Sequence, residues 1–116
     1  MKVFKAECIF VDVDDTLVLW GKPWSPASIT IHCCGRMELL EPHKLHIDCL
    51  KRAKKNGNCI VVWSGAGAEW ANDVIEALEL RKFVDVILAK PIAYIDDQSG
   101  SDILPEAQRI FLPQPA

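Results

Sequence analysis

Two aspartates and a threonine follow an apolar run near the start of the chain. Asp12, Asp14 and Thr16 stand at alternate positions after Cys8-Ile9-Phe10-Val11. A continuous apolar run is typical of a buried parallel strand, and open α/β sheets place their chemistry at the carboxyl ends of such strands. Carboxylates packed there cost electrostatic energy unless a cation or a catalytic task accounts for them. The pattern therefore predicts a site for cation binding or catalysis.

Further polar residues occupy equivalent places later in the chain. Ser64, Lys90 and the pair Asp96-Asp97 each follow, directly or closely, a run that we predict to be a strand. These strands are predicted at residues 59–63, 83–88 and 93–95. Because the carboxyl ends of parallel strands converge in one crevice, we expect these side chains to meet Asp12 around a single site.

Helical patterns separate the predicted strands. Pro42 is expected to begin a helix that ends before Asn56-Gly57-Asn58, and a second helix is predicted over 69–80. Strand, helix, strand, helix, strand is typical of a parallel sheet with right-handed crossovers. The sequence thus predicts an α/β fold in one domain over residues 1–116. The first strand is expected at residues 3–11 and a last edge strand at residues 109–112.

Residues 17–41 are predicted to form a loop and a small flap. A loop is expected over 17–26, because glycine and proline interrupt it. Residues 28–32 and 37–40 are predicted to pair as a β-hairpin around Gly35. Trp20 and Trp24 are interpreted as anchors of this flap, with stacking on a substrate ring as the alternative. Trp63 and Trp70 are assigned to the core.

The order Asp-x-Asp-x-Thr, serine, lysine, Asp-Asp resembles the haloacid dehalogenase superfamily of phosphohydrolases. The resemblance runs from about Val3 to Asp97 and implies a three-layer Rossmann-like, mostly parallel fold. It implies that Asp12 is the nucleophile that forms an aspartyl-phosphate. Asp14 would act first as the general acid and then as the base. Lys90 would bridge Asp12 and the phosphoryl group.

Substrate-binding roles follow from the same resemblance. Ser64 would hydrogen-bond a phosphoryl oxygen, and Thr16 belongs to the nucleophile motif. Backbone N–H groups after Asp12 and at Gly65 could donate to the phosphoryl oxygens. Such donors suit phosphoryl transfer, which concentrates negative charge on three oxygens.

Magnesium is the cofactor that the resemblance implies. Its ligands would be the Asp12 carboxylate, the Asp14 backbone carbonyl and the pair Asp96/Asp97, with Asp97 favoured as the direct ligand. Oxygen ligands suit Mg²⁺ rather than zinc. A cation is needed because a carboxylate nucleophile is otherwise repelled by a phosphate dianion.

The segments between the motifs are too short to hold a folded cap domain. The family inserts its caps after the first motif or between the second and third, and neither Thr16–Ser64 nor Ser64–Lys90 has the necessary length. An uncapped site is open, so the expected substrate is a phosphorylated macromolecule end or a small nucleotide or sugar phosphate.

Two other functions share these residue types. A receiver domain also uses an acidic pair, a phosphorylated aspartate, Ser/Thr and Lys around Mg²⁺, but its acidic pair follows the first strand. A relative that binds phosphate without turnover would be favoured by a missing motif residue, and none is missing. A hydrolase is therefore the preferred interpretation.

The histidines and cysteines suggest a weaker alternative. His32, Cys33 and Cys34 lie together, but four ligands at a recognisable zinc spacing are missing. His43 and His46 are expected to be polar surface positions of the first helix. The odd count of five cysteines without a CxxC spacing favours reduced thiols and a cytoplasmic location.

Composition narrows the expected partners. The formal net charge of −3 gives no basic field for nucleic acid or an anionic membrane. The N-terminal apolar run is too short to span a bilayer. A core of this size is compatible with a homodimer.

Overall fold

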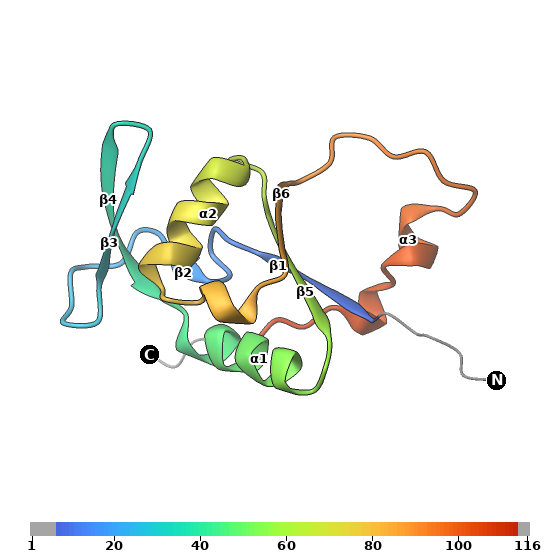
Figure 1. The fold of residues 1–116 in the computed structure, drawn as a ribbon, viewed down its shortest axis with the longest axis horizontal. Helices are drawn as coiled ribbons and strands as arrows, with labels where there is room; N and C mark the ends of the chain where they lie inside the picture. The colour runs from blue at the N-terminus through green and yellow to red at the C-terminus, as the bar shows by residue number, and fades with distance from the viewer. Residues whose placement is uncertain (1–6, 114–116) are drawn as a thin grey trace.

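A three-stranded parallel sheet forms the centre of the computed structural model, which describes residues 7–113 (Figure 1). Its strands are β1 (Cys8–Asp12), β5 (Cys59–Ser64) and β6 (Val86–Ala89), in the order β1-β5-β6. Cys8 lies opposite Cys59, and Ser64 lies opposite Ala89. The parallel pairing brings the carboxyl ends of all three strands to one edge, so the predicted α/β fold is confirmed. Residues 3–6 of the first predicted strand lie outside the described residues.

Two helices connect the strands. Helix α1 (Lys44–Lys55) precedes β5, and α2 (Ala68–Ala77) precedes the short turn η1 (Arg81–Phe83) and β6. Both helices pack against β5. The prediction that Pro42 begins α1 is wrong, because Pro42 is the last residue of strand β4 and His43 caps the helix. The buried apolar core contains residues of β5, of both helices, of the loop after β1 and of the segment between that loop and α1. Its members are Val13, Leu17, Val18, Ile31, Leu40, Leu50, Ile60, Val62, Ala71, Val74, Ile75 and Leu80.

The predicted hairpin is confirmed as a second, antiparallel sheet. Strand β3 (Ile29–Cys33) pairs with β4 (Arg36–Pro42), and β2 (Val18–Leu19) pairs with the end of β4 inside the segment expected to be a loop. Cys34 (φ +55°) and Gly35 (φ +74°) form the two-residue turn. Two positive φ values match the turn type that suits the twist of a hairpin.

The segment after β6, residues 90–113, differs from the expectation. The strands predicted at 93–95 and 109–112 are wrong, and this region contains only α3 (Gly100–Ile103) and η2 (Glu106–Gln108) as regular elements. Ile92 and Ile95 are fully exposed. Apolar β-formers make a strand only where a neighbouring strand pairs with their backbone, and β1 pairs with β5 alone among the described residues.

The prediction that His43 and His46 are surface residues is also wrong. They are only 1% and 6% exposed, and their rings stack with centroids 3.8 Å apart. Nε2 of His46 accepts the Leu112 N–H at 2.7 Å, so the ring proton lies on Nδ1 and is donated to the Thr16 carbonyl, also at 2.7 Å. His46 thereby joins the C-terminal segment to the loop that follows β1.

This histidine should make stability depend on pH. Burial lowers the pKa of His46. The hydrogen bond to the Thr16 carbonyl raises this pKa, and the nearby His43 lowers it further, so that the net shift is downward. Below about pH 6.5 the unfolded chain binds a proton that the folded protein does not. The free energy of unfolding should therefore fall as the pH drops from about 6.5 toward the folded-state pKa, by at most about 1.4 kcal/mol per pH unit.

Denaturant unfolding between neutral and mildly acidic pH checks this prediction. His46→Gln should have a flatter pH profile than the wild type, whereas His32→Gln, at an exposed position on β3, should keep the wild-type slope. Equal slopes in the wild type and His46→Gln would contradict the assignment.

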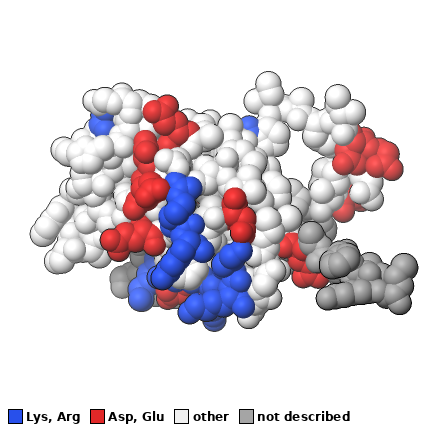
Figure 2. Space-filling model, viewed as in Figure 1, with Lys and Arg blue, Asp and Glu red and all other residues white. Residues whose placement is uncertain are grey.

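Charge on the surface is mixed. Figure 2 shows Lys and Arg side chains gathered over α1 and η1, with acidic side chains beside them. Lys54 on α1 pairs with Asp85 at 2.7 Å, and Asp85 also accepts the Ile60 N–H at the start of β5. The Lys54 ammonium, with the Ile60 N–H, lowers the pKa of Asp85. Within residues 7–113, none of the helices has the length and apolar character needed to cross a membrane.

Candidate active site

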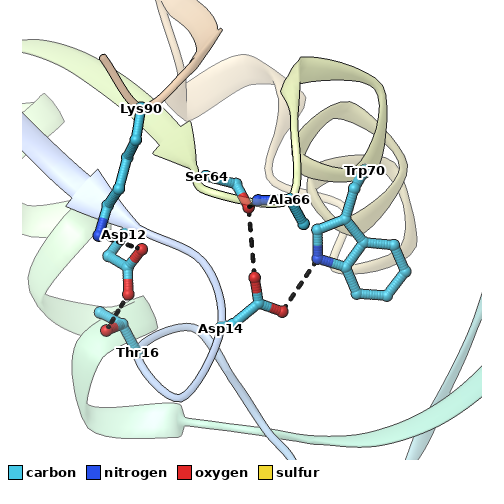
Figure 3. A network of polar contacts seen from close by, with 7 residues as sticks. All are labelled: Asp12, Asp14, Thr16, Ser64, Ala66, Trp70 and Lys90. Atoms are coloured by element: carbon cyan, nitrogen blue, oxygen red, sulfur yellow. Dashed lines mark hydrogen bonds and ion pairs between the residues drawn. The ribbon is translucent and has the colours of Figure 1, made fainter. Parts of the chain in front are cut away.

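Asp12 stands at the carboxyl end of β1 and holds two of the predicted site residues. Lys90 Nζ lies 3.0 Å from Oδ1 of Asp12, and the Thr16 hydroxyl donates to Oδ2 at 3.0 Å (Figure 3). About 31% of the Asp12 side chain is exposed, so one side of the carboxylate remains accessible to a ligand. The arrangement presents a carboxylate that is oriented from both oxygens and has a cation beside it.

The turn after β1 folds back on itself and sets these positions. The backbone N–H groups of Thr16, Leu17 and Val18 all lie within hydrogen-bond distance of the Val13 carbonyl. Asp15 takes the left-handed conformation (φ +59°), which aspartate tolerates better than most residues. With Val13 and Leu17 fully buried, the turn is anchored in the core, and Thr16 points back to Asp12.

Asp14 faces a different set of partners. Its Oδ1 accepts the indole N–H groups of Trp20 at 2.9 Å and Trp70 at 3.0 Å, and its Oδ2 accepts the Ser64 hydroxyl at 3.2 Å. Figure 3 shows Asp14 turned toward Ser64 and Trp70, while Thr16 and Lys90 point at Asp12. Three donors from three separate segments fix this carboxylate beside the nucleophile motif.

Ser64 is fully buried at the end of β5. Its hydroxyl accepts the Ala66 N–H at 3.0 Å, and its carbonyl accepts the backbone N–H of Lys90 at 2.9 Å. The hydroxyl also donates to Oδ2 of Asp14, and its hydrogen bond to a phosphoryl oxygen stays a prediction. Gly65 follows as an exposed residue of the turn into α2. The carbonyl bond also fixes the main chain from which the Lys90 side chain extends.

Lys90 reaches Asp12 across the end of β5. Its Nζ lies 5.9 Å from the centre of the Trp63 ring, within the range of a cation–π interaction. Trp63 in turn makes an edge contact with Phe10, with ring centroids 4.6 Å apart. The predicted core position of Trp63 is therefore only partly correct, because the residue is half-buried and borders the site.

Asp96 and Asp97 are not brought to this cluster. Both are exposed, and Asp96 Oδ1 accepts the Gln98 N–H of its own loop at 2.8 Å. Figure 1 shows the segment between β6 and α3 looping out from the sheet. Among the described residues, the three-ligand groups that could hold a metal do not include Asp12, Asp14 or this pair. The side chains around Asp12 therefore supply only part of the predicted Mg²⁺ site.

Sequence reasoning missed the roles of the two tryptophans. The anchoring interpretation of Trp20 agrees with the structure, but its anchor is the carboxylate of Asp14, and its backbone N–H also binds Asp15. Trp70 packs partly against the core, and its ring lies 6.0 Å from that of Trp20. Trp24 is 69% exposed. Spacing gave no signal for these bonds, since Trp20 and Trp70 lie in different elements.

A cavity of about 430 Å³ opens beside Asp14. Its walls come from the loop after β1, from the β3–β4 hairpin, and from the turn before α2 together with the first part of that helix. The lining residues are Asp14, Trp20, Cys33, Cys34, Arg36, Glu38, Ala66 and Trp70. Hydrogen bonding with Cys34 and with Asp73 raises the pKa of Cys33 to about 12. A neutral thiol is a poor nucleophile, so Cys33 is not a candidate nucleophile at this cavity.

Replacing Trp70 by Phe should destabilise the protein, because it removes one donor from the Asp14 carboxylate. We expect the free energy of unfolding to fall by about 1.5–3 kcal/mol, the range for a hydrogen bond to a charged group. Denaturant unfolding measures the change. Trp24→Phe, at an exposed position, should change stability by less than about 0.5 kcal/mol. An equal effect of both substitutions would show that the bond to Asp14 contributes nothing.

The chain matches no family model, and no curated protein and no solved structure is similar enough to count as a match. The function must therefore be inferred from the side chains around Asp12 and Asp14.

Proposed function

We propose that the protein hydrolyses phosphate monoesters through an aspartyl-phosphate on Asp12. The observation that carries this proposal is the contact of Asp12 with Lys90, 3.0 Å apart at the carboxyl end of β1. A carboxylate that is accessible, oriented and accompanied by a cation can attack a phosphoryl group, whose negative charge the ammonium partly neutralises. Asp14, two residues further on, supplies a second carboxyl group for proton transfer.

The proposed reaction has two halves. An Asp12 oxygen attacks phosphorus, the bond from phosphorus to the ester oxygen breaks, and Asp14 gives its proton to the leaving alcohol. Asp14 then takes a proton from water, which attacks phosphorus and breaks the bond to Asp12, so that inorganic phosphate leaves. Lys90 stays beside the Asp12 carboxylate and offers its charge to the phosphoryl oxygens in both halves.

The partners of Asp14 indicate which of its oxygens carries the proton. Indole N–H groups can only donate, so Oδ1, which receives two of them, remains an acceptor. The Ser64 hydroxyl at Oδ2 can rotate and accept instead. Oδ2 is therefore the atom that we expect to hold and release the proton.

We also propose Mg²⁺ as the cofactor, although the arrangement of the described residues does not complete its ligand set. Asp12 is the only carboxylate of the proposed set that lies in the Asp12–Lys90 cluster, because Asp96 and Asp97 occupy the exposed loop. When bound, Mg²⁺ would neutralise negative charge on the phosphoryl group. The steps above are derived from Asp12, Asp14 and Lys90 alone.

The proposed substrate is a phosphate on a nucleotide, a sugar or the end of a macromolecule. The cavity beside Asp14 is open to solvent, and no separate cap domain lies between the motifs in residues 7–113. We propose further that the three-stranded parallel sheet belongs to a three-layer Rossmann-like fold. The protein would then be a phosphohydrolase of the haloacid dehalogenase type that acts in the cytoplasm.

A phosphatase screen tests this function. The panel contains p-nitrophenyl phosphate, nucleotides, sugar phosphates, phosphopeptides and 3′-phosphorylated oligonucleotides, each assayed with Mg²⁺ and with a chelator. We expect turnover that the chelator abolishes. Stoichiometric labelling without turnover would instead indicate a receiver-like protein, and phosphate binding without labelling would indicate a binding domain. Turnover that persists in chelator would reject the metal while keeping the hydrolase.

A further inference from the structure

Two cysteines and a glutamate converge at the tip of the hairpin. Cys33 ends β3, Cys34 begins the turn, and Glu69 lies in the first turn of α2. One ligand atom from each residue lies within 4.8 Å of the other two, and the two sulfurs are 3.1 Å apart. Two elements that are distant along the chain thus present two thiols and a carboxylate to one point.

We propose that this cluster is a binding site for a thiophilic divalent cation such as Zn²⁺. A tetrahedral zinc ion takes Cys sulfur at about 2.3 Å and carboxylate oxygen at about 2.0–2.2 Å, which places neighbouring ligand atoms about 3.5–3.8 Å apart. The 3.1 Å between the two sulfurs and the 4.8 Å bound on the other separations bracket this spacing. Two thiolates favour a soft or borderline cation over Mg²⁺ or Ca²⁺.

Asp73 is the candidate for the fourth ligand. It follows Glu69 by four residues on α2 and therefore shares its helix face. Asp73 and Cys33 also line the same cavity at the hairpin tip. Either this carboxylate or a water molecule would complete four-fold coordination. The site contains no histidine, which distinguishes it from a zinc site built on His32.

The proposed cation site adjoins the cavity beside Asp14. Cys33 and Cys34 form part of the wall of the cavity that also contains Asp14, Trp20 and Trp70. A cation bound by both cysteines and Glu69 would join the hairpin turn to α2 and hold this wall in place. The inference rests on the cluster itself and holds whether or not Asp12 acts as a nucleophile.

Binding must displace the thiol protons, since the thiolate is the form that ligates a metal. One divalent cation replaces two protons, one from Cys33 and one from Cys34, and no oxidant or reductant takes part. Proton release and a thiolate-to-metal absorption band are therefore two independent signals of the same event.

The test adds Zn²⁺ or Cd²⁺ alone to the full-length, reduced protein under anaerobic conditions. We expect one cation per chain, proton release on binding, an ultraviolet thiolate band with Cd²⁺, and no competition from an excess of Mg²⁺. The double variant Cys33→Ser/Cys34→Ser should lose the band. The matched control Cys8→Ser/Cys59→Ser removes two thiols that lie opposite each other on β1 and β5, and it should retain the band.

A second pair of variants tests the carboxylate. Glu69→Gln should weaken Zn²⁺ binding at least about tenfold, whereas Glu76→Gln, at an exposed position of the same helix, should leave it unchanged. Because both positions are exposed, this pair remains informative even if the double cysteine variant fails to fold. Retention of the Cd²⁺ band without Cys33 and Cys34, or equal Zn²⁺ affinity of Glu69→Gln and the wild type, would overturn the proposal.

Discussion

Asp12→Asn is expected to abolish phosphate-ester hydrolysis, with kcat reduced by about 10⁴-fold or more, as when other enzymes lose their nucleophile. Asparagine has nearly the same size, and its carbonyl oxygen can still accept the Thr16 hydroxyl. What it lacks is the negative charge that pairs with Lys90 and the nucleophilic oxygen. Steady-state turnover of p-nitrophenyl phosphate measures the loss, and phosphoenzyme trapped by acid quench should disappear with it.

Two controls separate this chemical effect from misfolding. Asp102→Asn makes the same change at an exposed residue of α3 and should retain wild-type activity. The thermal midpoint of Asp12→Asn should stay close to that of the wild type, because a half-exposed ion pair contributes little to stability. Turnover by correctly folded Asp12→Asn at the wild-type rate would reject Asp12 as the nucleophile.

The second large effect is expected at Asp14. Asp14→Asn should lower kcat by about 10²–10⁴-fold, the usual contribution of general acid–base catalysis. The asparagine oxygen can still accept the indole N–H groups of Trp20 and Trp70, so the local fold is retained. The amide has no proton to give to the leaving alcohol and does not act as a base toward water.

Leaving-group dependence identifies this role. An alkyl phosphate needs the acid more than p-nitrophenyl phosphate does, because alkoxide is the poorer leaving group. The loss caused by Asp14→Asn should therefore be larger with the alkyl ester. Asp15→Asn changes the adjacent residue and keeps the oxygen that accepts the Trp20 backbone N–H, so its activity should be preserved. An identical loss with both esters would indicate that Asp14 does not protonate the leaving group.

Local pattern was sufficient for the central elements of the fold. Apolar runs predicted β1, β5 and β6, and alternation around Gly35 predicted the hairpin, because period and turn chemistry are properties of neighbouring residues. The same reasoning failed for residues 93–95 and 109–112, whose composition suits a strand. Whether such a segment pairs depends on which strand edge lies next to it, and that information lies elsewhere in the chain.

The candidate site shows the same difference between what local pattern predicts and what distant partners decide. The sequence by itself determined that Asp12, Ser64 and Lys90 would meet, because parallel strands bring their carboxyl ends to one edge. Only the tertiary structure decided that two indoles hold Asp14, that His46 is buried between Thr16 and Leu112, and that Cys33, Cys34 and Glu69 converge. Burial and the direction of a hydrogen bond depend on partners from distant elements. Residue spacing along the chain does not indicate which residues those partners are.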